Sequence, residues 1–150
     1  MKFYPKILFI SMVLLFAGCE RLPSEIKFFE NYDFSTGEYK LLVFGTEGDW
    51  IDDYRDFYID DIEVLKKMQK QWVFKYKTKT WACGYGYIVM LVDSNEVLKE
   101  AEVNIDCKYM TGWIRFPKRY LSNHKAHFKR MTEIEKKEFE EKYRWKKVKK

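Results

Sequence analysis

The chain has 150 residues, a net charge of +5 and three cysteines, and 47% of its residues are hydrophobic, which is enough for a packed core. A chain of this length forms one domain and needs no second. It contains neither a glycine-rich phosphate loop nor a Gly-x-Ser-x-Gly sequence, so no motif points to the nucleotide-binding or serine-hydrolase classes.

The first nineteen residues have the layout of a secretory signal. Lys2 and Lys6 form a short cationic start, and residues 7–16 are apolar except for Ser11. Two small residues, Ala17 and Gly18, stand directly before Cys19. An apolar run of this length is too short to span a bilayer. We therefore expect residues 1–18 to be a signal peptide that is removed from the mature protein.

The residues Phe16-Ala17-Gly18-Cys19 make this leader similar to those of the bacterial lipoprotein class. In that class the cysteine is acylated and the chain is cut directly before it. The resemblance implies a lipid such as palmitate on Cys19 and a place in the bacterial cell envelope, facing the periplasm or at the cell surface. Phe16 departs from the pattern, because leucine is commonest there. A cleaved secreted protein and an uncleaved signal anchor are the alternatives.

Charge is unevenly distributed along the rest of the chain. Residues 47–63 contain eight acids and one base, whereas residues 125–150 contain eleven bases and five acids. Basic segments often bind nucleic acid, but an exported chain rarely meets any, and we expect no nucleic-acid partner. Anionic lipid headgroups or an acidic protein are the expected counterparts of the basic end, and a solvated tail is the alternative.

Hydrophobic patterning predicts a lipid-anchored tether at 19–25, a single domain at 26–145 and a basic tail at 146–150. Strand patterns cover residues 39–44, 54–59, 73–77, 89–92, 97–105 and 113–116. Asp60 followed by Glu63 predicts a helix over 61–72, Pro117 a short helix, and Thr132 followed by Glu135 a helix to about residue 145. These elements predict an α+β fold with a mainly antiparallel sheet and two or three helices packed on one side.

Two cysteines lie symmetrically about a predicted hairpin turn. Residues 93–96 are turn formers between two strand patterns, and a hairpin centred on Asn95 pairs residue 91 with 99, 89 with 101 and 87 with 103. The same register places Cys83 opposite Cys107 and directs the apolar side chains of both strands to one face. We therefore predict a disulfide between Cys83 and Cys107, with two buried free thiols as the alternative.

No arrangement of polar residues predicts a metal or cofactor site, and we expect none. The acidic run from Glu47 to Asp61 lacks the alternating acids and central glycine of a calcium loop. His124 and His127 stand three residues apart, but a zinc site needs a third ligand. We interpret the acids as a solvated face and both histidines as solvated surface residues.

Aromatic residues make up 19% of the sequence, and most are expected in the core. Six of them stand in or near predicted turns, where a ring can anchor a protein or stack on a sugar. These candidate partner-binding residues are Trp50, Tyr54, Trp81, Tyr85, Tyr109 and Trp113.

The absence of a catalytic motif favours a membrane-anchored binding module without enzymatic activity. Its partner would be a macromolecule, either a protein or a glycan: an envelope component, an inhibited enzyme or a neutralised toxin. The alternative is a small envelope hydrolase that uses the clustered carboxylates of Asp52, Asp53 and Asp56.

Overall fold

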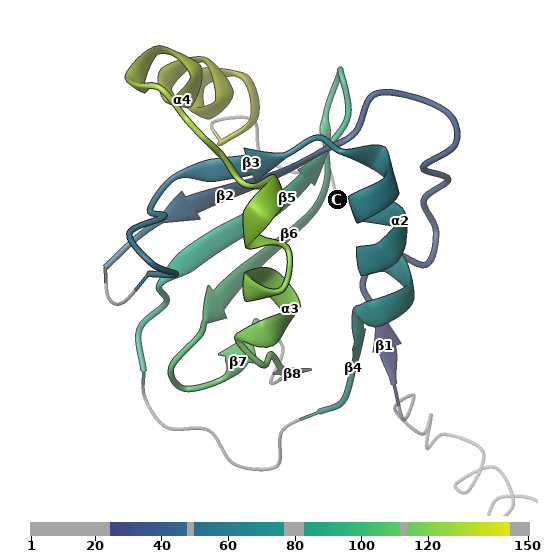
Figure 1. Cartoon of the computed structure of the whole chain (residues 1–150), viewed down its shortest axis with the longest axis vertical. Helices are drawn as coiled ribbons and strands as arrows, with labels where there is room; N and C mark the ends of the chain where they lie inside the picture. Colours follow the sequence, from purple (N-terminus) through teal and green to yellow (C-terminus); the bar gives the residue numbers. More distant parts are fainter. Residues whose placement is uncertain (1–24, 48–49, 77–82, 112–113, 145–150) are drawn as a thin grey trace, which may run out of the picture.

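The computed structural model describes residues 25–47, 50–76, 83–111 and 114–144. Its main feature is a seven-stranded sheet in the order β8-β7-β6-β5-β2-β3-β9, in which every neighbouring pair is antiparallel (Figure 1). The strands are β1 (Ile26–Lys27), β2 (Lys40–Gly45), β3 (Phe57–Ile59), β4 (Val73–Phe74), β5 (Tyr87–Val92), β6 (Val97–Asn104), β7 (Tyr109–Met110), β8 (Ile114–Arg115) and β9 (Lys129–Arg130). The helices are α2 (Ile62–Gln71), α3 (Arg119–Ser122), the 3₁₀ turn η1 (Lys125–His127), α4 (Glu133–Phe139) and the π-helical η2 (Glu140–Arg144). This arrangement confirms the α+β fold and the mainly antiparallel sheet.

The predicted hairpin forms in the predicted register. Tyr87 pairs with Val103 and Val89 with Ala101, and the ladder shifts by one residue beyond Leu91, so that Val92 rather than Asp93 faces Val97. Asp93 closes the turn, because its carboxylate accepts hydrogen bonds from the backbone N–H groups two and three residues later, at 2.7 and 2.8 Å.

The disulfide between Cys83 and Cys107 is present and lies just beyond the paired ends of β5 and β6, with a Cα–Cα distance of 6.6 Å. The Asn104 side chain stabilises the turn after β6, since its oxygen accepts a hydrogen bond from the Cys107 N–H at 2.6 Å. The two cysteines, which lie at equal distances from the hairpin turn in the sequence, are therefore bonded to each other in the structure.

Helix α2 covers one face of the sheet and buries Val64, Leu65 and Met68. Its N-cap is Asp61, which accepts hydrogen bonds from the backbone N–H groups of Glu63 and Val64. The predicted N-cap, Asp60, lies one residue before the observed one, and its carboxylate instead contacts Lys129. At the other end Trp72 is fully buried and its ring stacks on Phe29, with 4.9 Å between centroids.

Helix α3 adds Leu121 to the same core, but the C-terminal helix packs elsewhere. A second, smaller cluster joins Leu42, Phe44, Met90 and Val92 on the opposite face of the sheet to Tyr143 of η2. Two helices thus share one face as predicted, whereas the third element, α4 with η2, covers the other. Ile134 in the first turn of α4 is 71% exposed, whereas Phe139 and Tyr143 join the second cluster, so this helix docks through its C-terminal end.

The short strands differ most from prediction. Strand β3 is confined to Phe57–Ile59, β4 to Val73–Phe74 and β8 to Ile114–Arg115. Strand β9 has no apolar pattern, since it consists of Lys129 and Arg130, and it completes the sheet's second edge beside β3. Among the described residues, no helix is long and apolar enough to cross a membrane.

Candidate functional site

The acidic and basic stretches of the sequence contact one another. Four of the acids lie against bases that are 66 to 80 residues later in the chain. The pairs are Asp52 with Lys125 at 2.6 Å, Asp60 with Lys129 at 2.8 Å, Asp61 with His127 at 3.2 Å and Asp56 with Lys136 at 2.9 Å. Three of the four pairs stay exposed and only the Asp56 pair is enclosed, so these acids of the expected solvated face form a row of ion pairs, which we call the charge seam. The pairs compensate part of the charge asymmetry within the domain.

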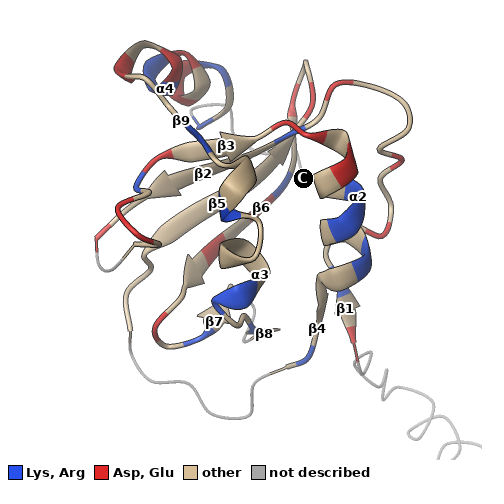
Figure 2. Ribbon diagram, in the orientation of Figure 1, with Lys and Arg blue, Asp and Glu red and all other residues tan. Residues whose placement is uncertain are grey.

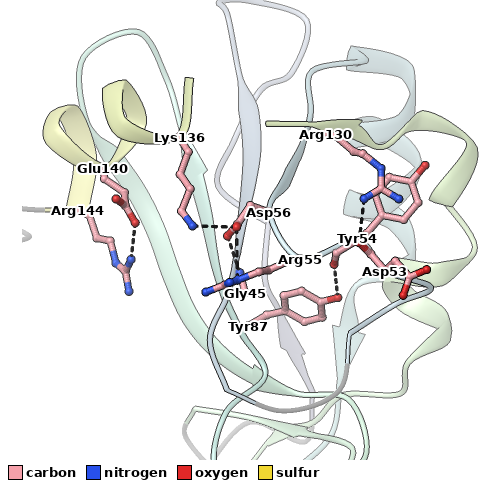
Figure 3. A network of polar contacts seen from close by, with 10 residues as sticks. All are labelled: Gly45, Asp53, Tyr54, Arg55, Asp56, Tyr87, Arg130, Lys136, Glu140 and Arg144. Atoms are coloured by element: carbon pink, nitrogen blue, oxygen red, sulfur yellow. Dashed lines mark hydrogen bonds and ion pairs between the residues drawn. The ribbon is translucent and has the colours of Figure 1, made fainter. Parts of the chain in front are cut away.

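Asp56 is the most enclosed acid of the charge seam, with 13% of its side chain exposed. Figure 3 shows it between two segments: its carboxylate accepts hydrogen bonds from the Gly45 N–H at 3.0 Å and from Lys136 at 2.9 Å. A Cβ atom at Gly45 would lie 2.8 Å from the carbonyl oxygen of Arg55, so only glycine allows this close approach.

Tyr87 anchors the loop between β2 and β3, which carries Asp52 and Asp53 (Figure 3). Its hydroxyl accepts a hydrogen bond from the Ile51 N–H and donates one to the Tyr54 carbonyl, both at 2.6 Å. Burial raises the pKa of this phenol to about 12, which keeps the hydroxyl protonated as a donor. Asp52 and Asp53 follow Ile51 with positive φ angles of 44° and 65°.

The three acids of the hydrolase hypothesis contact three different bases. Asp52 and Asp56 pair with different lysines, while the Asp53 carbonyl accepts a hydrogen bond from Arg130 at 2.8 Å. The hydrogen bond from Lys125 lowers the pKa of the Asp52 carboxyl, whereas a general acid needs a raised one. These contacts give the three residues a structural explanation and no observation favours catalysis by them.

The histidines differ from the prediction in one respect. His124 is not a solvated residue: it is only 6% exposed, its Nε2 lies 3.0 Å from the Gln71 side-chain oxygen, and burial lowers its pKa. His127 is exposed and pairs with Asp61. Within the described ranges, no group of three or more His, Cys, Asp or Glu side chains is arranged to hold a metal ion.

The candidate partner-binding rings that the structure describes pack against neighbouring side chains. Tyr54 packs edge-on against Phe128, with Arg130 4.2 Å from its ring centroid, and Trp50 lies beneath Arg55. Tyr109 is buried, packs against Tyr85 and donates a hydrogen bond to the Cys83 carbonyl. Trp81, Trp113 and the predicted lipidation site Cys19 lie outside the described residues.

A pocket of about 570 Å³ lies between β4, β8 and α3. Five bases line it: Lys75, Lys108, Arg115, Lys118 and Arg119. The remaining lining residues are Val73, Phe74, Tyr76, Pro117 and Tyr120. Figure 2 shows the basic segments gathered around α3 and the lower end of β4. We call this site the basic pocket.

Backbone hydrogen bonds bring the segments of the basic pocket together. The Arg115 N–H donates to the Lys75 carbonyl at 2.8 Å, and the Phe116 N–H donates to the Lys108 carbonyl at 3.0 Å. Lys108 directly follows the disulfide and has a φ of 57°, a conformation that costs about 1 kcal/mol or more outside glycine. The covalent bridge and the strand contact therefore hold this lysine at the pocket.

The floor of the basic pocket is aromatic. The rings of Phe74 and Tyr120 meet edge to face with 5.3 Å between centroids, and the Tyr120 hydroxyl donates to the Val73 carbonyl at 3.4 Å. Among the described residues, Lys108, Arg115 and Lys118 have no acidic partner within ion-pair distance, and Lys75 has only Glu25, at 3.9 Å. An apolar floor beneath uncompensated bases is suited to an anion that also carries apolar or sugar groups.

Sequence reasoning missed the basic pocket because its bases are scattered over more than forty positions. The only local signal was the group Arg115, Lys118 and Arg119 around Pro117, directly after a predicted strand. Comparisons of the chain with protein-family models, with curated proteins and with solved structures found no match.

Proposed function

We propose that this chain is a lipid-anchored lipoprotein of a bacterial cell envelope whose domain binds an anionic partner in that envelope without chemically altering it. The leader ending at Cys19 supports the location, through its similarity to lipoprotein leaders. The observation that carries the binding role is the basic pocket, with five bases and no carboxylate among its lining residues.

The basic pocket favours an envelope component over the other partner classes. Its arginines offer planar, multidentate donors to phosphate or carboxylate groups, and Tyr76 and Tyr120 offer rings to sugars or apolar chains. Glycans and lipids of an envelope combine these groups.

Capture of the partner from native envelopes tests this proposal. The bait is the mature protein, compared with the Arg115→Ala/Lys118→Ala variant; both side chains are exposed, so their truncation leaves the core intact. Lys137→Ala/Lys142→Ala removes the same charge from the exposed side of α4 and η2 and is the matched control. We expect one anionic component to be retained by the parent and the control and lost with the pocket variant. Equal retention by all three proteins would contradict the proposal.

A further inference from the structure

The basic pocket lies where the chain enters the domain. Strand β1, which begins at Ile26, pairs with β4 through Ile26 and Phe74, and Phe74 is part of the pocket floor. Glu25 lies 3.9 Å from Lys75 of the pocket. Figure 1 shows β1, β4, β8 and α3 at one end of the molecule and α4 at the other.

This position limits the distance between the pocket and an anchor at Cys19. Cys19 and Glu25 are six positions apart, and an extended chain spans at most about 3.5 Å per residue, which gives roughly 20 Å. The domain would therefore be held close to the bilayer by the end that carries the five bases. Cationic side chains within a Debye length of an anionic leaflet are attracted to it.

We infer that the basic pocket binds the phosphate-bearing headgroup of an anionic lipid in the membrane that holds the Cys19 anchor, an inference that rests on the proposed function and names its partner. Arg115 and Arg119 supply forked donors to phosphate oxygens, while Lys75, Lys108 and Lys118 add charge. Tyr76, which is 37% exposed, and Tyr120 offer amphipathic rings of the kind found at membrane interfaces.

Vesicle binding tests the inference with purified components. The protein is the chain from residue 19 onward, which keeps every described residue, with Cys19→Ser so that no acyl chain contributes. Its partitioning is measured onto phosphatidylcholine vesicles with and without phosphatidylglycerol, at low and high salt. Inorganic phosphate is added as a competitor, because a pocket for free phosphate would be blocked by it while a headgroup site at a charged surface would retain most of its binding.

We expect binding to the phosphatidylglycerol vesicles alone, weakened by salt. Removing two pocket bases lowers the partition coefficient by roughly 30-fold, since each is worth about 1 kcal/mol at an anionic surface. Two independent variants, Arg115→Ala/Lys118→Ala and Lys75→Ala/Arg119→Ala, must both show this loss, which separates it from a folding defect in either one. The Lys137→Ala/Lys142→Ala control retains binding.

Three results would overturn the inference: no preference for phosphatidylglycerol, an equal loss in the α4 control, or complete displacement by inorganic phosphate. None of them would by itself remove the proposed function. If capture from native envelopes still depends on the basic pocket, the domain binds an anionic partner that is a protein or a glycan. If capture is independent of the pocket, the proposed function fails whatever the vesicles show.

Discussion

Single side chains in this domain join segments that are distant in the sequence. Tyr87 is the clearest example, because one phenol both accepts from Ile51 and donates to Tyr54 from the middle of the sheet. The loop between β2 and β3, which carries Asp52 and Asp56 of the charge seam, is thereby tied to β5. A buried hydroxyl with two partners stabilises through the backbone groups it satisfies.

Tyr87→Phe is expected to lower the free energy of unfolding by roughly 1–3 kcal/mol, since it leaves the buried Ile51 N–H without an acceptor. Chemical denaturation of both proteins measures the difference. Tyr39→Phe is the matched control, because that ring packs on Phe34 and its hydroxyl has no hydrogen bond to any described residue. Equal stability of the two variants would show that the Tyr87 hydroxyl contributes nothing.

His124 makes stability depend on mildly acidic pH. Burial lowers its folded-state pKa below the ordinary value of 6.5, so the unfolded chain binds a proton that the folded protein does not. Its contribution is complete above pH 6.5 and is lost as the pH falls toward the folded-state value. Lys67 and His127, the nearby bases, lower the pKa further.

We expect the free energy of unfolding to fall as the pH drops below 6.5, with a slope of at most about 1.4 kcal/mol per pH unit. This window lies above the one in which the carboxylates with lowered pKa values, such as Asp52 and Asp61, lose their contribution. His124→Gln should remove the slope and His127→Gln, an exposed residue, should leave part of it. Denaturation series at several pH values decide this, and an unchanged slope in His124→Gln would refute the assignment.

At the scale of elements, the β5–β6 hairpin connects the core to the basic pocket. Its register buries Val89 and Val103, and its disulfide leads directly to Lys108 at the pocket edge. The bridge closes a loop with a sequence separation of 24. In the chain-entropy model a loop of this size stabilises a protein by roughly 3 kcal/mol.

Cys83→Ser/Cys107→Ser should therefore lower the free energy of unfolding by roughly 3 kcal/mol. It should also weaken vesicle binding, because Lys108 loses the constraint that holds its left-handed conformation. Denaturation and non-reducing peptide mapping are the measurements, and the parent protein under reducing conditions should match the variant. Recovery of both thiols free from protein made in an oxidising compartment would contradict the bridge.

The whole molecule has two charged regions with different roles. The charge seam joins the β2–β3 region to the C-terminal third, and its exposed pairs contribute little to stability because solvent screens them. In the basic pocket, in contrast, four of the five bases have no acidic partner within ion-pair distance among the described residues, and Lys75 contacts only Glu25. Uncompensated charge is available to a partner, whereas compensated charge is used by the fold.

Membrane attachment is a prediction for the whole molecule. Cys19→Ser should block processing of the leader, so that the uncut precursor accumulates, because the proposed acylation requires the thiol. Gel mobility and fractionation of membranes measure this, with Ser24→Ala in the predicted tether as the control. A variant cut at the same bond and still bound to the membrane as tightly as the parent would disprove lipidation.

The sequence by itself determined the local features of this protein. The hairpin register follows from the period of two in β6 together with a turn that Asp93 closes through its own side chain. The capping box of Thr132 and Glu135 needs only residues three apart, and it forms as predicted. The disulfide belongs to this group because its cysteines are equidistant from that turn.

Tertiary structure alone decided which distant side chains meet. Asp56 contacts Lys136, eighty residues later in the chain. Helix α4 docks on the sheet face opposite α2, and five bases that are scattered in the sequence line one pocket. Charge has no periodicity that encodes its partner, and a two-residue strand such as β9 has no apolar pattern to reveal it. These contacts depend on how the strands are ordered in the sheet, which short-range physical preferences do not specify.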